Sequence, residues 1–193
     1  MQINRILTYI SVLVILLSFI NLGLVINGNA VGTLNITIYD YVNINFTTNL
    51  VNFGNGAIDS GKSNASIDTL GNVVNGNWTP INNGFILENM GNVNVSLDLK
   101  SEKTAVQFLG GTSPLYQYNF TDKAGETGSC LNETFLKGTW INVNTTSSGD
   151  RLCNPLRFEN SNDTIRIDIK LVIPSDSLTG NLTDTFTATG TVI

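Results

Sequence analysis

The strongest constraint on the fold is an alternation of apolar and polar side chains with a period of two residues. Across residues 165–173 every second side chain is isoleucine or leucine, and Arg166, Asp168 and Lys170 stand between them. Successive side chains of a β-strand point to opposite faces, so the pattern predicts one face on a core and one face in water. The same alternation recurs over residues 34–38, 42–46, 93–99 and 186–192.

Turn signals separate these runs and complete the prediction of the fold. They are Asn55-Gly56, Asn75-Gly76, Asn83-Gly84, Gly110-Gly111 and Ser148-Gly149-Asp150. Such dipeptides favour tight turns between strands, and no amphipathic helix is recognisable after Ala30. We therefore predict an all-β fold: a single antiparallel β-sandwich of the Ig-like or jelly-roll type over residues 31–193, with roughly seven to nine strands.

The N-terminal segment, residues 1–30, predicts export. Arg5 is the only charge before Asp40, and residues 6–26 form an apolar stretch of 21 residues. One interpretation is a signal peptide cleaved after the small-residue sequence Gly28-Asn29-Ala30. The other is a retained membrane anchor, because about 20 apolar residues span a bilayer. Both place the rest of the chain outside the cytoplasm, secreted or held at the cell surface.

Cysteines and glycosylation sequons fit that compartment. Cys130 and Cys153 are the only cysteines, and two cysteines in an oxidising compartment predict one disulfide. The exported part also contains ten Asn-x-Ser/Thr sequons, which makes their asparagines candidates for N-glycosylation. These begin at Asn35, Asn45, Asn64, Asn77, Asn94, Asn119, Asn132, Asn144, Asn162 and Asn181. Asn35, Asn45 and Asn94 fall on the polar parity of their expected strands, so each is predicted to face solvent.

Composition excludes several classes of function. The chain has no histidine, which rules out histidine-based catalytic triads and histidine-ligated metal sites. Its net charge of −5 argues against a nucleic-acid partner. Gly110-Gly111-Thr112 lacks the lysine and the spacing of a phosphate-binding loop. We therefore expect no enzymatic activity, no cofactor and no metal site.

Three weaker candidates for a site remain. Asp98 and Asp168 lie on the predicted solvent faces of strands and are the conceivable pair for glycosidase chemistry. Residues 159–163 offer oxygen ligands for calcium without the spacing of a calcium loop, so a turn is the better interpretation. Aromatic side chains could instead form a sugar-binding platform. Its candidates are Trp78, Trp140, Tyr116 and Tyr118, although Trp140 also lies where it could pack on the disulfide.

Three stretches carry a resemblance to known proteins. They are Val51-Asn52-Phe53-Gly54 with Gly61, the run from Leu87 to Val95, and Asp163 to Ile169 followed by Ile173-Pro174 and Gly180. In this order they resemble archaeal exported surface β-sandwich proteins and, more distantly, TasA/camelysin-type filament subunits. The resemblance implies an extracellular sandwich used in coats, filaments or adhesion. The layout is also similar to that of archaeal type IV pilins, but Arg5 is followed directly by Ile6 without the glycine of their processing site.

We therefore expect a non-enzymatic cell-surface structural or adhesive protein that associates with itself or with other surface proteins. Assembly by β-strand addition is expected through residues 34–38 or 186–193, because both runs are strand-like and lack a charged or proline residue. The first run becomes a free end if the N-terminal segment is cleaved. The alternatives are a carbohydrate-binding module or accessory domain of an exported hydrolase, and a type IV pilin-like subunit. An uncleaved N-terminal segment would add the membrane as a partner.

Overall fold

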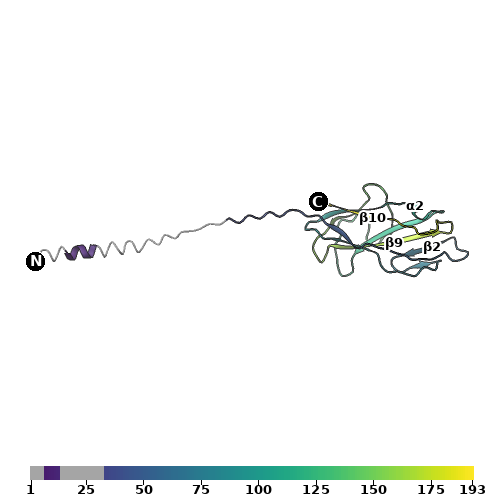
Figure 1. Cartoon of the computed structure of the whole chain (residues 1–193), viewed down its shortest axis with the longest axis horizontal. Coiled ribbons are helices and arrows are strands. Elements are labelled where there is room, and N and C mark those ends of the chain that lie inside the picture. Colours follow the sequence, from purple (N-terminus) through teal and green to yellow (C-terminus); the bar gives the residue numbers. More distant parts are fainter. Residues whose placement is uncertain (1–6, 14–32) are drawn as a thin grey trace. The chain divides into compact units, whose positions relative to one another are not determined.

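The computed structural model describes residues 7–13 and 33–193 (Figure 1). The chain divides into two compact units, 1–38 and Tyr39–Ile193, which are treated separately. In the described part of the first unit, residues 7–13 are helical and residues 33–38 belong to no strand. No helix among the described residues is long and apolar enough to cross a membrane. The predicted cleavage site and most of the predicted apolar segment lie outside the described residues.

The second unit is a sandwich of two antiparallel sheets, as the alternation predicted. The larger sheet has seven strands and the smaller has three. Strands and the one helix follow in the order β1 (Ile44–Thr48), β2 (Asn64–Asp68), β3 (Val73–Val74), β4 (Phe85–Asn89), β5 (Val95–Ser101), α2 (Ala105–Leu109), β6 (Leu115–Asp122), β7 (Ile141–Asn142), β8 (Asp150–Leu156), β9 (Thr164–Pro174) and β10 (Phe186–Val192).

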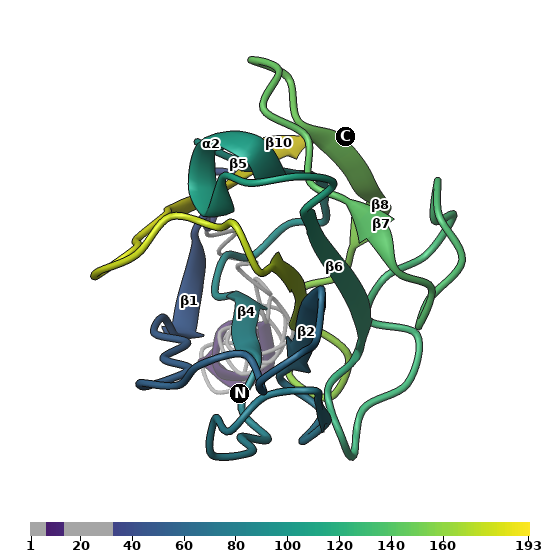
Figure 2. The same cartoon turned by 90° about the vertical axis from the view of Figure 1, so that its right-hand side faces the viewer.

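Strand β9 organises the larger sheet. Along one side it pairs with β6. Along its other side β4 pairs with residues 164–167 and β2 with residues 170–174. The short strands β7, β1 and β3 then pair with β6, β4 and β2 and form the edges. In the smaller sheet β5 lies between β10 and β8, and Figure 2 shows this layer with α2 beside β5.

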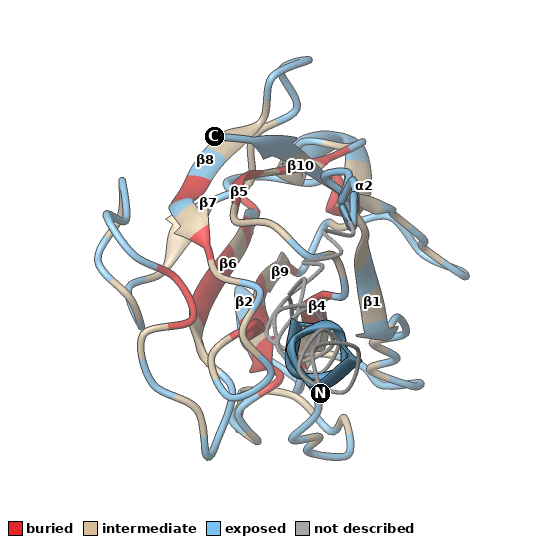
Figure 3. Cartoon of the chain, turned by 90° about the vertical axis from the view of Figure 1, so that its left-hand side faces the viewer, coloured by how far each residue is buried: buried red, intermediate tan, exposed pale blue. Residues whose placement is uncertain are grey.

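The core confirms the parity that the alternation predicted. Ile165 and Ile167 of β9 and Val95 and Leu97 of β5 are fully buried. Their side chains fill the space between the sheets, together with those of β6 and β8. Figure 3 shows the buried stretches along these central strands, with exposed residues in the loops and near the termini. Because every second side chain is apolar, both sheets bury one face against the other.

Two expectations about secondary structure are wrong. Residues 34–38 form no strand, because nothing among the described residues pairs with their backbone. Conversely, α2 is a helix where none was expected. Thr104 caps it: its side chain accepts from the Gln107 N–H, and the Gln107 side chain accepts from the Thr104 N–H. The reciprocal Thr-x-x-Gln box is a recognised helix start, but a five-residue helix is too short to give a periodic signal.

Candidate functional site

A cleft of about 690 Å³, lined mostly by apolar residues with some polar ones, lies over the inner face of the larger sheet. Its floor comes from β2, β9 and β6, and its walls from residues 50–55, which follow β1, and residues 180–184, which precede β10. The smaller sheet has three strands against seven, so loops rather than strands border this part of the inner face. A volume of this size falls within the range of about 300–1,000 Å³ usual for binding sites.

Six aromatic side chains line the cleft, and four of them touch in sequence. Phe186 of β10 joins the two sheets, because its ring centroid lies 5.7 Å from that of Phe85 on β4 and 5.8 Å from that of Tyr116 on β6. The Tyr116 ring lies 4.9 Å from that of Phe108 on α2. Tilted and edge-on contacts of this kind are favourable and hold the rings in place. The lining is therefore preformed. The six are Phe53, Trp78, Phe85, Phe108, Tyr116 and Phe186.

Trp78 is placed by two glycines. A Cβ atom at Gly56 would lie 2.3 Å from the Trp78 ring, and one at Gly76 would lie 2.6 Å from it. Both predicted Asn-Gly turns thus serve a second purpose, because only glycine lets the backbone approach the indole this closely. The indole is half-buried at the cleft and packs against the core.

One charged residue, Asp184, lines the cleft, and one of its two carboxylate oxygens is hydrogen-bonded. Asp184 Oδ2 accepts hydrogen bonds from the Ser101 hydroxyl at 2.5 Å and from the Tyr116 hydroxyl at 3.0 Å. Burial, together with the neighbouring Asp184, raises the pKa of Tyr116 well above its ordinary value. The phenol therefore stays neutral and donates. The other carboxylate oxygen, Asp184 Oδ1, is buried and has no hydrogen-bond partner among the described residues.

Residues 33–38 of the first unit alternate polar and apolar side chains and pair with no other described segment. Leu34, Ile36 and Ile38 are 92%, 80% and 76% exposed. Residues 39–41, which belong to the second unit, are tied to the turn between β4 and β5. There the Asn92 side chain accepts from the Tyr41 N–H at 2.6 Å and donates to the Tyr39 carbonyl at 3.0 Å. Residues 39–41 therefore lie beyond the Asn89 end of β4, whereas the cleft lies at the Phe85 end.

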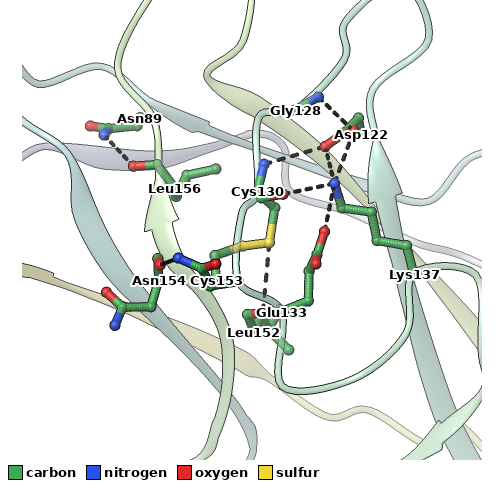
Figure 4. The surroundings of a disulfide bond; sticks show 11 residues. Asn89, Asp122, Gly128, Cys130, Glu133, Lys137, Leu152, Cys153, Asn154 and Leu156 are labelled. Carbon is green, nitrogen blue, oxygen red and sulfur yellow. Dashed lines mark hydrogen bonds and ion pairs between the residues drawn. A yellow bond between two sulfur atoms is a disulfide. The ribbon is translucent and has the colours of Figure 1, made fainter.

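The predicted disulfide joins Cys130 and Cys153 and is fully buried. Figure 4 shows an ionic cluster beside it. Lys137 Nζ lies 2.9 Å from Asp122 Oδ1 and 2.9 Å from Glu133 Oε1, and it also donates to the Cys130 carbonyl at 2.8 Å. Trp140 does not pack on the disulfide as expected. It is half-buried, with Lys170 Nζ 5.7 Å from its ring centroid.

The expected pair of acids is not brought together. Asp98 is on β5 of the smaller sheet, where Arg151 binds it. Asp168 is on β9 of the larger sheet and is buried, which corrects the prediction that it faces solvent. Its carboxylate accepts from the Thr69 hydroxyl at 2.7 Å and from Arg166 Nε at 2.9 Å. The loop after β2 covers this part of the outer face, an effect that the alternation of β9 does not reveal.

The prediction that four aromatic side chains form one sugar-binding surface is also wrong. Tyr116 and Tyr118 are buried, since both lie on the inner face of β6. Trp78 borders the cleft, whereas Trp140 precedes the edge strand β7 and lies near Lys170 on the outer face. The four rings therefore do not share one face.

Residues 159–163 form the predicted turn, and the carboxylates of its two acidic residues bind side chains of the protein. Glu159 binds Arg157 at 3.0 Å, and Asp163 Oδ1 accepts from the Thr164 hydroxyl at 2.8 Å. Among residues 7–13 and 33–193, no cluster of three or more acidic or cysteine side chains could hold a metal ion.

The ten sequon asparagines occupy different environments. Asn119 is buried, and Asn94, Asn144 and Asn162 are half-buried. The expectation that Asn94 faces solvent is wrong, because its Oδ1 atom is buried. The asparagine precedes β5 in the turn after β4 rather than lying within a strand. The exposed members are Asn35, Asn45, Asn64, Asn77, Asn132 and Asn181.

Comparison of the chain with protein-family models, curated proteins and solved structures gave no match. The site therefore has to be interpreted from its own geometry. Sequence reasoning missed the cleft, because its lining comes from segments between residues 50 and 186 that only the fold brings together. A partial signal was the cluster of apolar residues in Leu50-Val51-Asn52-Phe53, which follows an alternating strand without continuing its alternation.

Proposed function

We propose that the protein is a non-enzymatic structural or adhesive subunit of the cell surface, and that its copies assemble by β-strand addition into a coat or filament. Residues 33–38 of one copy are the donor. The acceptor is the aromatic cleft of a second copy, beside the unpaired edge of β10. The observation that carries the proposal is the presence, in one chain, of an exposed alternating segment and an apolar cleft.

Chemical complementarity supports this pairing. Leu34, Ile36 and Ile38 would lie on one face of an added strand. The segment 33–39 has no charged residue, and Asp184 is the one charged residue among those that line the cleft. Fully burying each aliphatic side chain contributes about 1.5–3 kcal/mol, which offsets the entropy lost on ordering the segment.

Backbone pairing supports the same proposal. Within the described sheets β10 pairs only with β5, so its other edge has unpaired backbone groups next to the cleft wall. Strand addition to such an edge provides backbone hydrogen bonds, while side-chain pockets provide specificity. Both terminal runs that the sequence pointed to thus take part: residues 33–38 as donor and Phe186–Val192 as acceptor edge.

The experiment compares self-association of the full chain with that of a donor variant, L34S/I36S/I38S, by light scattering and electron microscopy. We expect the protein concentration at which assembly begins to be at least about 100-fold higher for the variant, because the apolar contacts of three side chains are removed. The control T33S/T37S changes the opposite face of the segment, keeps the sequon at Asn35 and should assemble normally.

A second pair of variants tests the acceptor. Leu50 is 67% exposed and lines the cleft, whereas Leu136 is 79% exposed and does not. L50E should weaken assembly, because it places a charge where an apolar segment would lie, and L136E should not. Assembly that survives both L34S/I36S/I38S and L50E would refute the proposal.

A further inference from the structure

We infer that the sequons divide into two groups, and that N-glycans are attached at Asn35, Asn45, Asn64, Asn77 and Asn181, whereas the other five asparagines, which are hydrogen-bonded through Nδ2 or at least partly buried, carry none. The inference is independent of whether the copies assemble. It rests on the burial and the hydrogen bonds of each asparagine side chain.

The chemistry requires an accessible Nδ2 atom. In N-glycosylation the amide nitrogen attacks C1 of a sugar carried on a lipid phosphate. The new Nδ2–C1 bond forms as the C1–O bond to the phosphate breaks. The lipid phosphate leaves, and Nδ2 gives up one proton. A bulky glycan then remains on the surface, so a buried or already bonded Nδ2 is a poor acceptor.

The first group meets this requirement. Asn35, Asn45, Asn64 and Asn181 are exposed, and their side chains make no hydrogen bond within the described parts of the chain. Asn77 is also exposed and uses only its oxygen: Oδ1 accepts from the Ala57 N–H at 2.6 Å. In each case Nδ2 is left for the transfer.

Three members of the second group use the amide nitrogen in a hydrogen bond, and the other two are at least partly buried. Asn132 Nδ2 donates to the Asn154 carbonyl at 2.9 Å and so ties the loop after Cys130 to β8. Asn144 Nδ2 donates to Asp150 Oδ1, and Asn162 Nδ2 to the Thr127 carbonyl, both at 2.9 Å. Asn119 is buried on β6 and Asn94 is half-buried, and the Oδ1 atom of each is buried without a hydrogen-bond partner among the described residues.

Two members of the first group, Asn35 and Asn45, also suit the outer surface of an assembly, whereas Asn181 lies on the wall of the cleft. Asn35 lies between Leu34 and Ile36, so in an extended segment its side chain points away from theirs. Asn45 has the same relation to Ile44 and Phe46 on β1, where it is exposed and they are half-buried. A glycan at either position would leave the apolar face uncovered.

The test uses the full chain, expressed with its N-terminal segment in a host whose export pathway performs N-glycosylation, followed by intact mass measurement and glycopeptide mapping. Removing the hydroxyl residue of a sequon leaves its asparagine unchanged. T37A, T47A, S66A, T79A and T183A should each lower the intact mass by one glycan.

Matched substitutions test the second group. N132Q, N144Q and N162Q should leave the glycan mass unchanged and lower the Tm, because each removes a hydrogen bond of the native loop. Glycans at Asn94, Asn119, Asn132, Asn144 or Asn162 would overturn the inference, as would an unmodified chain. Equal occupancy of all ten sequons would also overturn it, by showing that attachment precedes folding and ignores the native structure.

Discussion

At the scale of single residues, Asp98 and Asp168 show how similar sequence contexts lead to different environments. Each lies between apolar residues of an alternating strand. Asp98 binds Arg151, whose side chain is 43% exposed, in a surface ion pair. Asp168 is buried and holds both Thr69 and Arg166. Arg166 in turn donates to the Thr69 carbonyl and to Asn82, so the carboxylate organises the loop that covers β9.

We expect D168A to lower the free energy of unfolding by about 3 kcal/mol, because it leaves Arg166 and Thr69 without their buried acceptor. D98A is the matched control and should cost less than about 1 kcal/mol, since exposed ion pairs contribute little. Urea denaturation of both variants provides the measurement. Equal losses would show that Asp168 is not the centre of this network.

At the scale of elements, the loop between the cysteines depends on two kinds of link. The disulfide closes a loop with a separation of 23 residues, which contributes about 3 kcal/mol by the chain-entropy argument. Lys137 then fixes the first half of the loop to the end of β6 through Asp122. Burial by itself would raise the pKa of Asp122. Hydrogen bonds from Lys137 and from the Gly128 and Cys130 backbone outweigh this effect, so the pKa lies below its ordinary value.

The ionic cluster predicts a pH dependence. Glu133 likewise has a lowered pKa, since the bond from Lys137 outweighs its partial burial. Carboxylates with a lowered pKa stabilise the fold above their ordinary pKa values, 3.8 for Asp122 and 4.5 for Glu133, and lose that contribution as the pH falls through the lowered values. K137M should therefore lower the free energy of unfolding by about 1–2 kcal/mol at pH 7 and by progressively less below about pH 4.

Thermal or urea unfolding across the pH range measures this difference. K123M is the control, because Lys123 is 47% exposed and lies 3.8 Å from Glu126. It should change stability little at any pH. A K137M deficit that stays constant from pH 7 to pH 2 would contradict the assignment of this stability to the two carboxylates.

At the scale of the whole molecule, residues 39–41, which follow the proposed donor segment in the chain, and the cleft lie at different ends of β4. Residues 39–41 are held beside Asn92, beyond Asn89, whereas Phe85 borders the cleft. A contact between two different surfaces is heterologous, and it grows into an open chain unless the rotation closes a ring. Under the proposed function, each copy thus has one giving end and one receiving end.

This polarity predicts that L34S/I36S/I38S acts as a cap. The variant retains the cleft and can receive a segment, but it cannot donate one, so a small fraction mixed with wild-type chain should shorten the assemblies. Electron microscopy of the mixtures gives the length distribution. Assemblies of unchanged length, with the variant excluded from them, would show that the cleft does not receive the segment.

Prediction from sequence succeeded where local pattern decides the outcome. The alternation located β9, β5, β1 and β10, and the two cysteines gave the disulfide. Prediction fails where segments that are distant in the chain meet. The alternation of β9 points Asp168 to solvent, but the loop after β2, about 100 residues away in the chain, covers it. The alternation of residues 34–38 suits a strand, but a side-chain pattern does not show whether a pairing partner exists.

The class of fold therefore follows from the amino-acid sequence alone, because strand periodicity and turn chemistry are local properties. Packing of the two sheets sets which faces are covered, where a cleft remains between them, and which asparagine amides are already bonded. These properties depend on contacts between residues far apart in the chain. Phe85, Tyr116 and Phe186 line one cleft only because β4, β6 and β10 lie in two sheets packed face to face.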